Sequence, residues 1–134
     1  MIPAVAFVGP SQVGKTSLIE KLIPEFAKHD CRVATIKHSG HEIALDTPGK
    51  DSWRLSQAGS DPVVAASDEA AFLVQRGRPL EVEAILRLVE DQADIALVEG
   101  FKRSTLPKVE VHRGAVSGKL LAPAEELIAV VSDE

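Results

Sequence analysis

Near the start of the chain, directly after an apolar run, the sequence reads Gly9-Pro10-Ser11-Gln12-Val13-Gly14-Lys15-Thr16. This segment matches the pattern G-x-x-x-x-G-K-[ST] in full, and an amphipathic stretch follows it. A strand before the loop and a helix after it are the context that separates a phosphate-binding loop from a chance match. The segment therefore predicts a P-loop that holds the phosphates of a nucleoside triphosphate.

The spacing of the loop residues has a physical cause. Gly9 and Gly14 permit backbone angles and close approaches that a β-carbon would block. Successive N–H groups can then converge on a phosphate at the N-terminus of a helix, where the helix dipole favours anions. The ammonium of Lys15 is expected to reach the β- and γ-phosphates, and the hydroxyl of Thr16 to ligate Mg²⁺.

Apolar runs alternate with amphipathic stretches along the rest of the chain, which predicts an α/β fold with a mostly parallel sheet flanked by helices. The predicted strands are residues 3–8, 32–37, 62–66, 71–75, 95–98, 108–112 and 127–131, and the predicted helices are residues 17–29, 52–58 and 80–90. Pro24 is expected to shorten or kink the first helix, because it lacks a donor and clashes with the preceding turn. Polar and apolar residues alternate in 108–112, which predicts an edge strand that could pair with a second copy of the chain.

The composition is that of a globular domain, with 45% apolar and 26% charged residues among 134. No repeat or long linker divides the chain, so we expect a single P-loop nucleotide-binding domain over residues 1–134. The apolar runs are too short to cross a membrane, and the N-terminal residues do not resemble a signal peptide. A net charge of −5 argues against a nucleic acid polymer as partner. A single cysteine agrees with a cytoplasmic location.

A P-loop needs a nearby carboxylate to complete the metal shell or to orient its waters. Glu99 is the main candidate, because the apolar strand before it delivers it to the strand's carboxyl end, where ligands bind in open α/β sheets. Gly100 is expected to leave room there for phosphate. Asp46, in the segment Asp46-Thr-Pro-Gly49, is a rival that can assist the metal or position the attacking water. A simple Pro-Gly turn explains Asp46 equally well, and a solvated strand end is the plain alternative for Glu99.

Four further blocks of sequence are distinctive: Thr35-Ile-Lys-His38, Asp46-Thr-Pro-Gly-Lys-Asp-Ser-Trp-Arg54, Ala58-Gly-Ser-Asp61 and Leu97-Val-Glu-Gly-Phe-Lys102. Together with the P-loop they resemble the MobB family, the adapter proteins of molybdopterin-guanine dinucleotide biosynthesis. The resemblance covers most of the chain, from the first strand to the last apolar run. The second and fourth blocks carry most of its specificity, because a P-loop alone occurs in many unrelated enzymes.

The resemblance implies a P-loop NTPase fold that binds GTP with Mg²⁺ and hydrolyses GTP slowly at most. It also implies a homodimer whose strands extend between subunits. The implied partner is the guanylyltransferase MobA, which joins GMP to molybdopterin, and molybdopterin itself is a second candidate. Carried onto this sequence, the residues that would hold the phosphates are Gly9, Gly14, Lys15, Thr16 and Ser17. Glu99 would lie near the metal, and residues 37–54 would line the pocket or the partner surface.

The chain contains no Asn-Lys-x-Asp motif that reads guanine, so the expected preference for GTP rests on the resemblance alone. Asp133, just after the last predicted strand, is a residue that could hydrogen-bond a guanine edge. The main alternative function is a small-molecule kinase that uses ATP and Mg²⁺ on the same loop, although the arginines are not gathered into a lid. A regulatory GTPase is a third alternative, against which the missing guanine motif counts. For slow hydrolysis, Lys15 would neutralise charge, and Asp46 or Glu99 would position water.

Overall fold

The computed structural model describes residues 1–40, 43, 46–77, 80–114 and 117–133. Its elements are β1 (Ala4–Val8), α1 (Lys15–Lys28), β2 (Val33–Lys37), α2 (Asp51–Gln57), β3 (Val63–Ala66), β4 (Ala71–Val74), α3 (Val82–Val89), β5 (Ile95–Glu99), β6 (Lys108–His112), a short 3₁₀ turn (Ala124–Glu126) and β7 (Leu127–Ser132). They form two compact units, Met1–Ser39 with Glu81–Glu134, and Gly40–Leu80. The expectation of one domain over residues 1–134 stays a prediction. None of the helices described here is long and apolar enough to cross a membrane.

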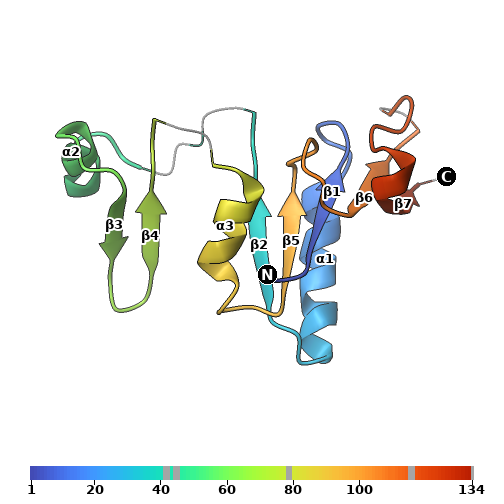
Figure 1. The fold of residues 1–134 in the computed structure, drawn as a ribbon, viewed down its shortest axis with the longest axis horizontal. Helices are drawn as coiled ribbons and strands as arrows, with labels where there is room; N and C mark the ends of the chain where they lie inside the picture. The colour runs from blue at the N-terminus through green and yellow to red at the C-terminus, as the bar shows by residue number, and fades with distance from the viewer. Residues whose placement is uncertain (41–42, 44–45, 78–79, 115–116, 134) are drawn as a thin grey trace. The chain divides into compact units, whose positions relative to one another are not determined.

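The larger unit is built on five parallel strands in the order β2-β5-β1-β6-β7 (Figure 1). The central strand β1 pairs with β5 on one side and with β6 on the other. Parallel neighbours bring their carboxyl ends to the same edge of the sheet, so the P-loop after β1 meets the ends of β5 and β2 there. The predicted α/β fold, a mostly parallel sheet flanked by helices, is confirmed.

Successive residues of the central strand face two separate hydrophobic clusters. Ala6 belongs to a cluster with Leu86 of α3, and the next residue, Phe7, belongs to a cluster with Ile19 of α1. This period of two is what a strand buried on both faces requires. One helix therefore covers each face of the sheet, and α1 is held with its first turn at the carboxyl edge.

Helix α1 begins at Lys15, directly after the P-loop, and continues through Pro24 to Lys28. Pro24 therefore does not shorten the helix, so that part of the prediction is wrong, and a kink at Pro24 stays a prediction. An interior proline costs about 3 kcal/mol, whereas full burial of one large apolar side chain contributes about 2 kcal/mol. Several apolar residues of α1 pack on the sheet beside Ile19, namely Leu18, Leu22, Ile23 and Phe26. Their combined burial outweighs the lost donor.

Strand β6 is an interior strand, which corrects the expectation of an edge at Lys108–His112. It lies between β1 and β7, and β7 forms that end of the sheet. The polar residues that suggested an exposed face are buried, with Lys108 0% and Glu110 2% exposed. The carboxylate of Glu110 accepts hydrogen bonds from the backbone N–H groups of Leu121 and Ala122. Strand β6 therefore has no open edge at which a second copy of the chain could pair.

Lys108 is satisfied in the same way, by groups of the chain itself. Its ammonium donates to the carbonyl oxygens of Ser104 and Leu106, and it forms an ion pair with the carboxylate of Glu126. A buried charge persists in a folded protein only when it is paired and hydrogen-bonded. Two of the three polar residues of this strand, Lys108 and Glu110, therefore belong to buried polar networks, and the third, His112, is half-buried.

The smaller unit holds α2 and an antiparallel hairpin of β3 and β4, with Ala66 paired to Ala71 across the turn. Both strands and the helix lie within a residue or two of their predicted bounds. After the end of α2, Gly59 adopts a φ of 111°, the left-handed conformation that commonly follows a helix end. The helix predicted over residues 52–58 therefore ends one residue early, at Gln57, with Ala58 as its C-cap and Gly59 just beyond it.

Candidate functional site

The P-loop packs closely against the neighbouring strand β6. A β-carbon on Gly9 would lie 2.6 Å from the carbonyl oxygen of Val111 and 3.1 Å from the side chain of Val13. The first of these distances is shorter than any normal contact, and Gly9 also has a φ of 150°. Any larger residue would push the loop away from β6. The first glycine of the pattern is therefore required for contact between the loop and a strand.

The second glycine of the pattern is required for its backbone angle. A β-carbon on Gly14 would meet nothing within 4 Å, but Gly14 has a φ of 102°, and Gln12 has a φ of 62°. Left-handed residues among right-handed ones turn successive N–H groups into a concave anion site. Gly14 is also the N-cap of α1, whose first turn has neither an acidic residue nor a side-chain cap. The uncapped N–H groups and the helix dipole both favour an anion here.

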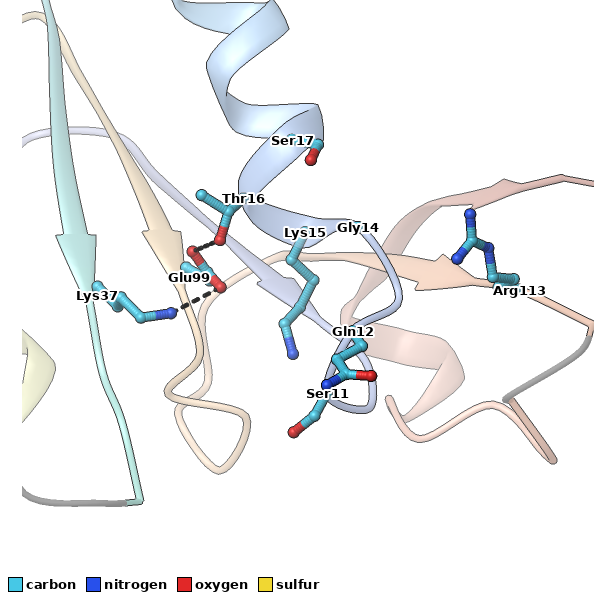
Figure 2. Close-up of a pocket in the computed structure, with 9 residues that line it drawn as sticks. All are labelled: Ser11, Gln12, Gly14, Lys15, Thr16, Ser17, Lys37, Glu99 and Arg113. Carbon is cyan, nitrogen blue, oxygen red and sulfur yellow. Dashed lines mark hydrogen bonds and ion pairs between the residues drawn. The ribbon is translucent and has the colours of Figure 1, made fainter.

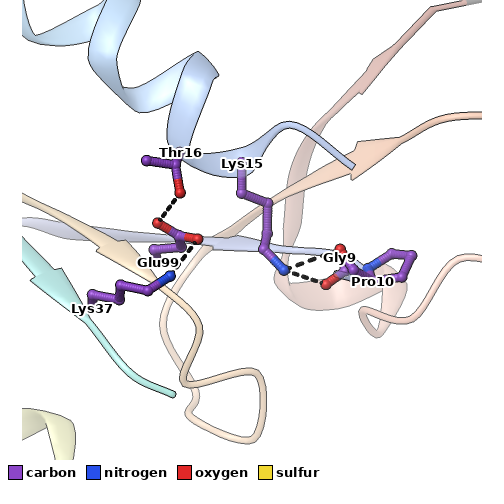
Figure 3. A network of polar contacts seen from close by, with 6 residues as sticks. All are labelled: Gly9, Pro10, Lys15, Thr16, Lys37 and Glu99. Atoms are coloured by element: carbon purple, nitrogen blue, oxygen red, sulfur yellow. Dashed lines mark hydrogen bonds and ion pairs between the residues drawn. The ribbon is translucent and has the colours of Figure 1, made fainter. Parts of the chain in front are cut away.

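The side chain of Lys15 turns back over the loop (Figure 3). Its ammonium donates to the carbonyl oxygens of Gly9 at 2.6 Å and Pro10 at 3.2 Å. Burial lowers the pKa of Lys15 below its usual value, and the nearby carboxylate of Glu99 opposes this only in part. The result is a partly desolvated positive charge beside the N–H groups of the loop, as phosphate binding requires.

Glu99 ends β5 and links the helix start to strand β2 (Figure 3). Its Oε2 accepts a hydrogen bond from the Thr16 hydroxyl at 2.7 Å, and its Oε1 accepts one from the Lys37 ammonium at 2.9 Å. Burial acts to raise the pKa of Glu99, but the hydrogen bonds from Lys37 and Thr16 and the charges of Lys37 and Lys15 outweigh it, so the pKa lies below its usual value. With 12% of its side chain exposed, Glu99 is not a freely solvated strand end.

These groups line a cavity of about 520 Å³ (Figure 2). Of the predicted nucleotide-binding residues, those that line it are Ser11, Gln12, Gly14, Lys15, Thr16 and Ser17. The remaining three hold the loop in place. Val13 is buried in the core beside α1, and Gly9 and Pro10 supply the carbonyl oxygens that accept from the lysine.

Two cationic residues of the cavity, Lys37 and Arg113, are not assigned by the P-loop pattern. Lys37 ends β2, and the strand register places it opposite Glu99. Its position at the end of a predicted strand next to that of Glu99 is therefore the sequence feature that could have identified it as a residue of the site. Arg113 directly follows β6, and no sequence motif marks it. Together with Lys15, these residues give the cavity three cations, against Glu99 as the one carboxylate among the described residues that line it. The cavity therefore suits an anion although the chain carries a net charge of −5.

The space beside Gly100 has a different use from the predicted one. Gly100 has a φ of 99°, and a β-carbon there would lie 2.8 Å from the carbonyl oxygen of His38. The room is thus taken by backbone, which corrects the expectation that it is kept for phosphate. The N–H of His38 donates to the carbonyl oxygen of Glu99 at 2.9 Å, and its ring centroid lies 4.3 Å from that of Phe101. This packing ties the end of β2 to the end of β5.

Asp46, the second acidic candidate, lies in the smaller unit and is held by residues of that unit. Its carboxyl group is 3% exposed, and Oδ1 accepts a hydrogen bond from the Ser52 hydroxyl at 2.8 Å. Oδ2 lies 3.6 Å from the Arg76 guanidinium, which is an ion-pair distance but too long for a hydrogen bond. These contacts give Asp46 a place in the packing of its own unit, and its part in hydrolysis stays a prediction.

Thr16 and Glu99 have the donor chemistry that Mg²⁺ prefers. Their hydroxyl and carboxylate oxygens are hard ligands, and they lie 2.7 Å apart. No group of three or more His, Cys, Asp or Glu that could hold a metal occurs in the described part of the chain. Mg²⁺ commonly takes one or two protein oxygens and completes its shell with phosphate oxygens and water. The residues at this strand end fit that pattern.

A five-stranded parallel sheet, with this loop between its central strand and a helix, defines a P-loop α/β protein. The family model for MobB, "Molybdopterin guanine dinucleotide synthesis protein B", matches residues 4–133. The chain therefore belongs to the MobB family, as its sequence blocks predicted.

Individual relatives agree with this assignment. The chain is 39% identical, over 134 residues, to the molybdopterin-guanine dinucleotide biosynthesis adapter protein of Haemophilus influenzae, covering 98% of this chain and 75% of that protein. It is 36% identical to the adapter protein of the same name from Escherichia coli, covering 99% of this chain and 79% of that protein. A crystal structure of Bacillus subtilis MobB matches with a TM-score of 0.75 and 26% identity, over 99% of this chain and 81% of that one.

Proposed function

We propose that this chain binds GTP with Mg²⁺ in the P-loop cavity and acts as an adapter in molybdopterin-guanine dinucleotide biosynthesis. The observation that carries the nucleotide part is the contact of Thr16 with Glu99 beside the partly buried ammonium of Lys15. The adapter role is supported by membership of the MobB family and by the names of the curated relatives.

The loop and its neighbours divide the work of holding a triphosphate. The N–H groups of residues 11–17 and the ammonium of Lys15 would bind the β- and γ-phosphates. Thr16 and Glu99 would hold Mg²⁺ directly or through its waters, and the ion would supply charge neutralisation between those phosphates. Lys37, paired with Glu99, adds a second cation at the same end of the cavity.

Any hydrolysis in this site is proposed to be slow. Phosphoryl transfer depends on positioning and on neutralising charge, which Lys15 provides. The candidates for positioning the attacking water are Asp46 and Glu99, and both carboxylates already accept hydrogen bonds from neighbouring side chains. We expect the rate of GTP hydrolysis to fall in Asp46→Ala or in Glu99→Ala, and unchanged rates in both variants would remove this assignment.

The proposed partner is the guanylyltransferase that joins GMP to molybdopterin, with molybdopterin as a second candidate ligand. We also propose a cytoplasmic homodimer. Because β6 is paired on both sides, a sheet shared between subunits would have to use another edge. A monomeric mass in light scattering would contradict the dimer and leave the nucleotide site unaffected.

Calorimetric titration of the purified chain with GTP and with ATP, each with Mg²⁺ in the same buffer, tests the proposal. We expect clear preference for GTP and, next, co-elution of the GTP-loaded chain with the guanylyltransferase. Preference for ATP would leave the P-loop fold intact and replace the adapter function by that of a small-molecule kinase. A phosphorylated metabolite would then be the product to seek.

A further inference from the structure

The P-loop cavity has two sides, and the sheet order separates them. Strand β5, which carries Glu99, pairs with one side of β1, and β6 pairs with the other. Figure 2 shows Glu99 and Lys37 on one side of the loop and Arg113 on the opposite side, with Gly14 between them. The sequence indicates the residues of the first side, Glu99 from its strand end and Lys37 from the family resemblance, but it does not indicate Arg113.

The position of Arg113 is set by close packing of β6 on the loop. The carbonyl oxygen of Val111, two residues before Arg113, occupies the space that Gly9 leaves open. Val8, the last residue of β1, is in register with Glu110. The end of β6 therefore cannot shift relative to the loop without breaking either the register or this contact.

The backbone and side chain of Arg113 are both held by neighbouring groups. Its N–H donates to the Ser117 hydroxyl at 3.0 Å, and the N–H of Gly114 donates to Oδ1 of Asp133 at 3.1 Å. The guanidinium Nε lies 3.6 Å from Oδ2 of Asp133, which follows the adjacent strand β7. Both side chains are about half exposed, at 53% and 51%. An exposed pair of this kind is weak, so the guanidinium remains available to a stronger anionic partner.

The P-loop residues Lys15 and Thr16 determine which way round a bound nucleotide would lie in the cavity. In a P-loop, the lysine reaches the β- and γ-phosphates, and the hydroxyl of the last motif residue is on the metal between them. Here these groups are Lys15 and Thr16, and the contact of Thr16 with Glu99 places this end of the triphosphate toward β5. The α-phosphate and the nucleoside must then leave the loop on the β6 side.

We propose that Arg113 is a nucleotide-binding residue that contacts the α-phosphate and the nucleoside attached to it. The inference rests on the proposed nucleotide function and assigns an end of the cavity that the P-loop motif does not cover. A guanidinium offers five donors in a planar fork, which suits a phosphate oxygen pair or the acceptor edge of a purine. GTP and GDP share this end and differ only at the γ-phosphate.

The test is calorimetric titration of GTP and GDP, with Mg²⁺, against wild type, Arg113→Ala and Arg113→Lys. We expect Arg113→Ala to weaken both nucleotides by a similar factor, about tenfold, as for loss of a charge-assisted hydrogen bond. Arg113→Lys should restore part of the affinity. Arg87→Ala, an exposed arginine on α3 outside the cavity, is the matched control and should bind like wild type.

The outcomes separate the inference from the proposed function. If Arg113→Ala weakens GTP alone, Arg113 contacts the γ-phosphate and the orientation is wrong. If it binds both nucleotides like wild type, Arg113 has no part in binding, while the P-loop site stands. If wild type binds neither nucleotide, the proposed function itself fails. Urea unfolding of each variant shows whether a loss of affinity reflects a loss of fold.

Discussion

Two strands flank the central strand of the sheet, and each carries a lysine–glutamate contact with a different character. At the tip of β5, Glu99 accepts from Lys37, whose side chain is 61% exposed, and from the Thr16 hydroxyl. At the start of β6, Lys108 is fully buried and is bound to Glu126 and to backbone carbonyl oxygens. The lysine and glutamate at the tip of β5 border the cavity, whereas the buried lysine at the start of β6 holds parts of the fold together.

This difference shows which charged residues of a strand indicate a ligand-binding site. The groups at the tip of β5 border a cavity and can exchange their partners for a phosphate or a cation. Every partner of Lys108 belongs to the fold, so any exchange would leave a buried charge unpaired. We therefore expect changes at β5 to affect binding and changes at β6 to affect stability.

The largest expected effect is the replacement of Lys108. Lys108→Met keeps the volume but leaves Glu126 and the carbonyl oxygens of Ser104 and Leu106 without their donor. Removing one partner of a buried pair costs about 3 kcal/mol, and urea unfolding should show that loss. Lys28→Ala breaks an exposed pair with side chains 67% and 60% exposed, and it should cost about 0.5 kcal/mol or less. Equal costs in the two variants would contradict the distinction.

A smaller effect, on binding, is expected at the other strand. Glu99→Gln keeps the shape of the side chain but removes the charge beside Thr16 and Lys37. The gain in GTP affinity on adding Mg²⁺ should fall about tenfold, as expected for loss of a charged interaction. Asp94→Asn alters an exposed carboxylate just before the start of the same strand and should leave the affinity unchanged. Calorimetry with and without Mg²⁺ checks both, and an unchanged Mg²⁺ effect in Glu99→Gln would remove Glu99 from the metal site.

The smallest expected effect concerns pH. Because the pKa of Glu99 is lower in the folded state, its contribution to the free energy of unfolding is complete above the pKa of the unfolded chain. The contribution is lost as the pH falls through the folded pKa. As the pH falls from about 7 to below about 4.3, the ordinary pKa of a glutamate, wild type should therefore lose more stability than Glu99→Gln. Urea unfolding at several pH values measures this, and parallel profiles for the two proteins would contradict it.

The sequence predicts the β5 side of the site well and the β6 side poorly. The P-loop is contiguous, and each of its residue types is fixed by phosphate chemistry, so the sequence pattern alone identifies it. Glu99 is predictable because an apolar strand delivers it to a known edge of the sheet. Arg113 acquires its place only through the pairing of β6 with β1, which no local pattern encodes.

The misassigned strand has a related cause. Alternation of polar and apolar residues reports two faces of a strand, but it does not report whether a polar face meets water or backbone. For Lys108 the answer depends on the carbonyl oxygen of Leu106, just before the strand, and for Glu110 on the N–H of Ala122, well after it. Pro24 shows the same limit, because the apolar face of α1 keeps the helix intact past it.

The most direct test of the account is GTP titration of Lys15→Ala with Mg²⁺, beside wild type and the Lys28→Ala variant of the same helix. The account predicts binding in wild type and in Lys28→Ala. For Lys15→Ala it predicts a loss of about a hundredfold or more, the scale for loss of hydrogen bonds to a charged group, with unchanged urea unfolding. Wild-type affinity in Lys15→Ala would contradict it, since the cavity would then not bind phosphate through the loop.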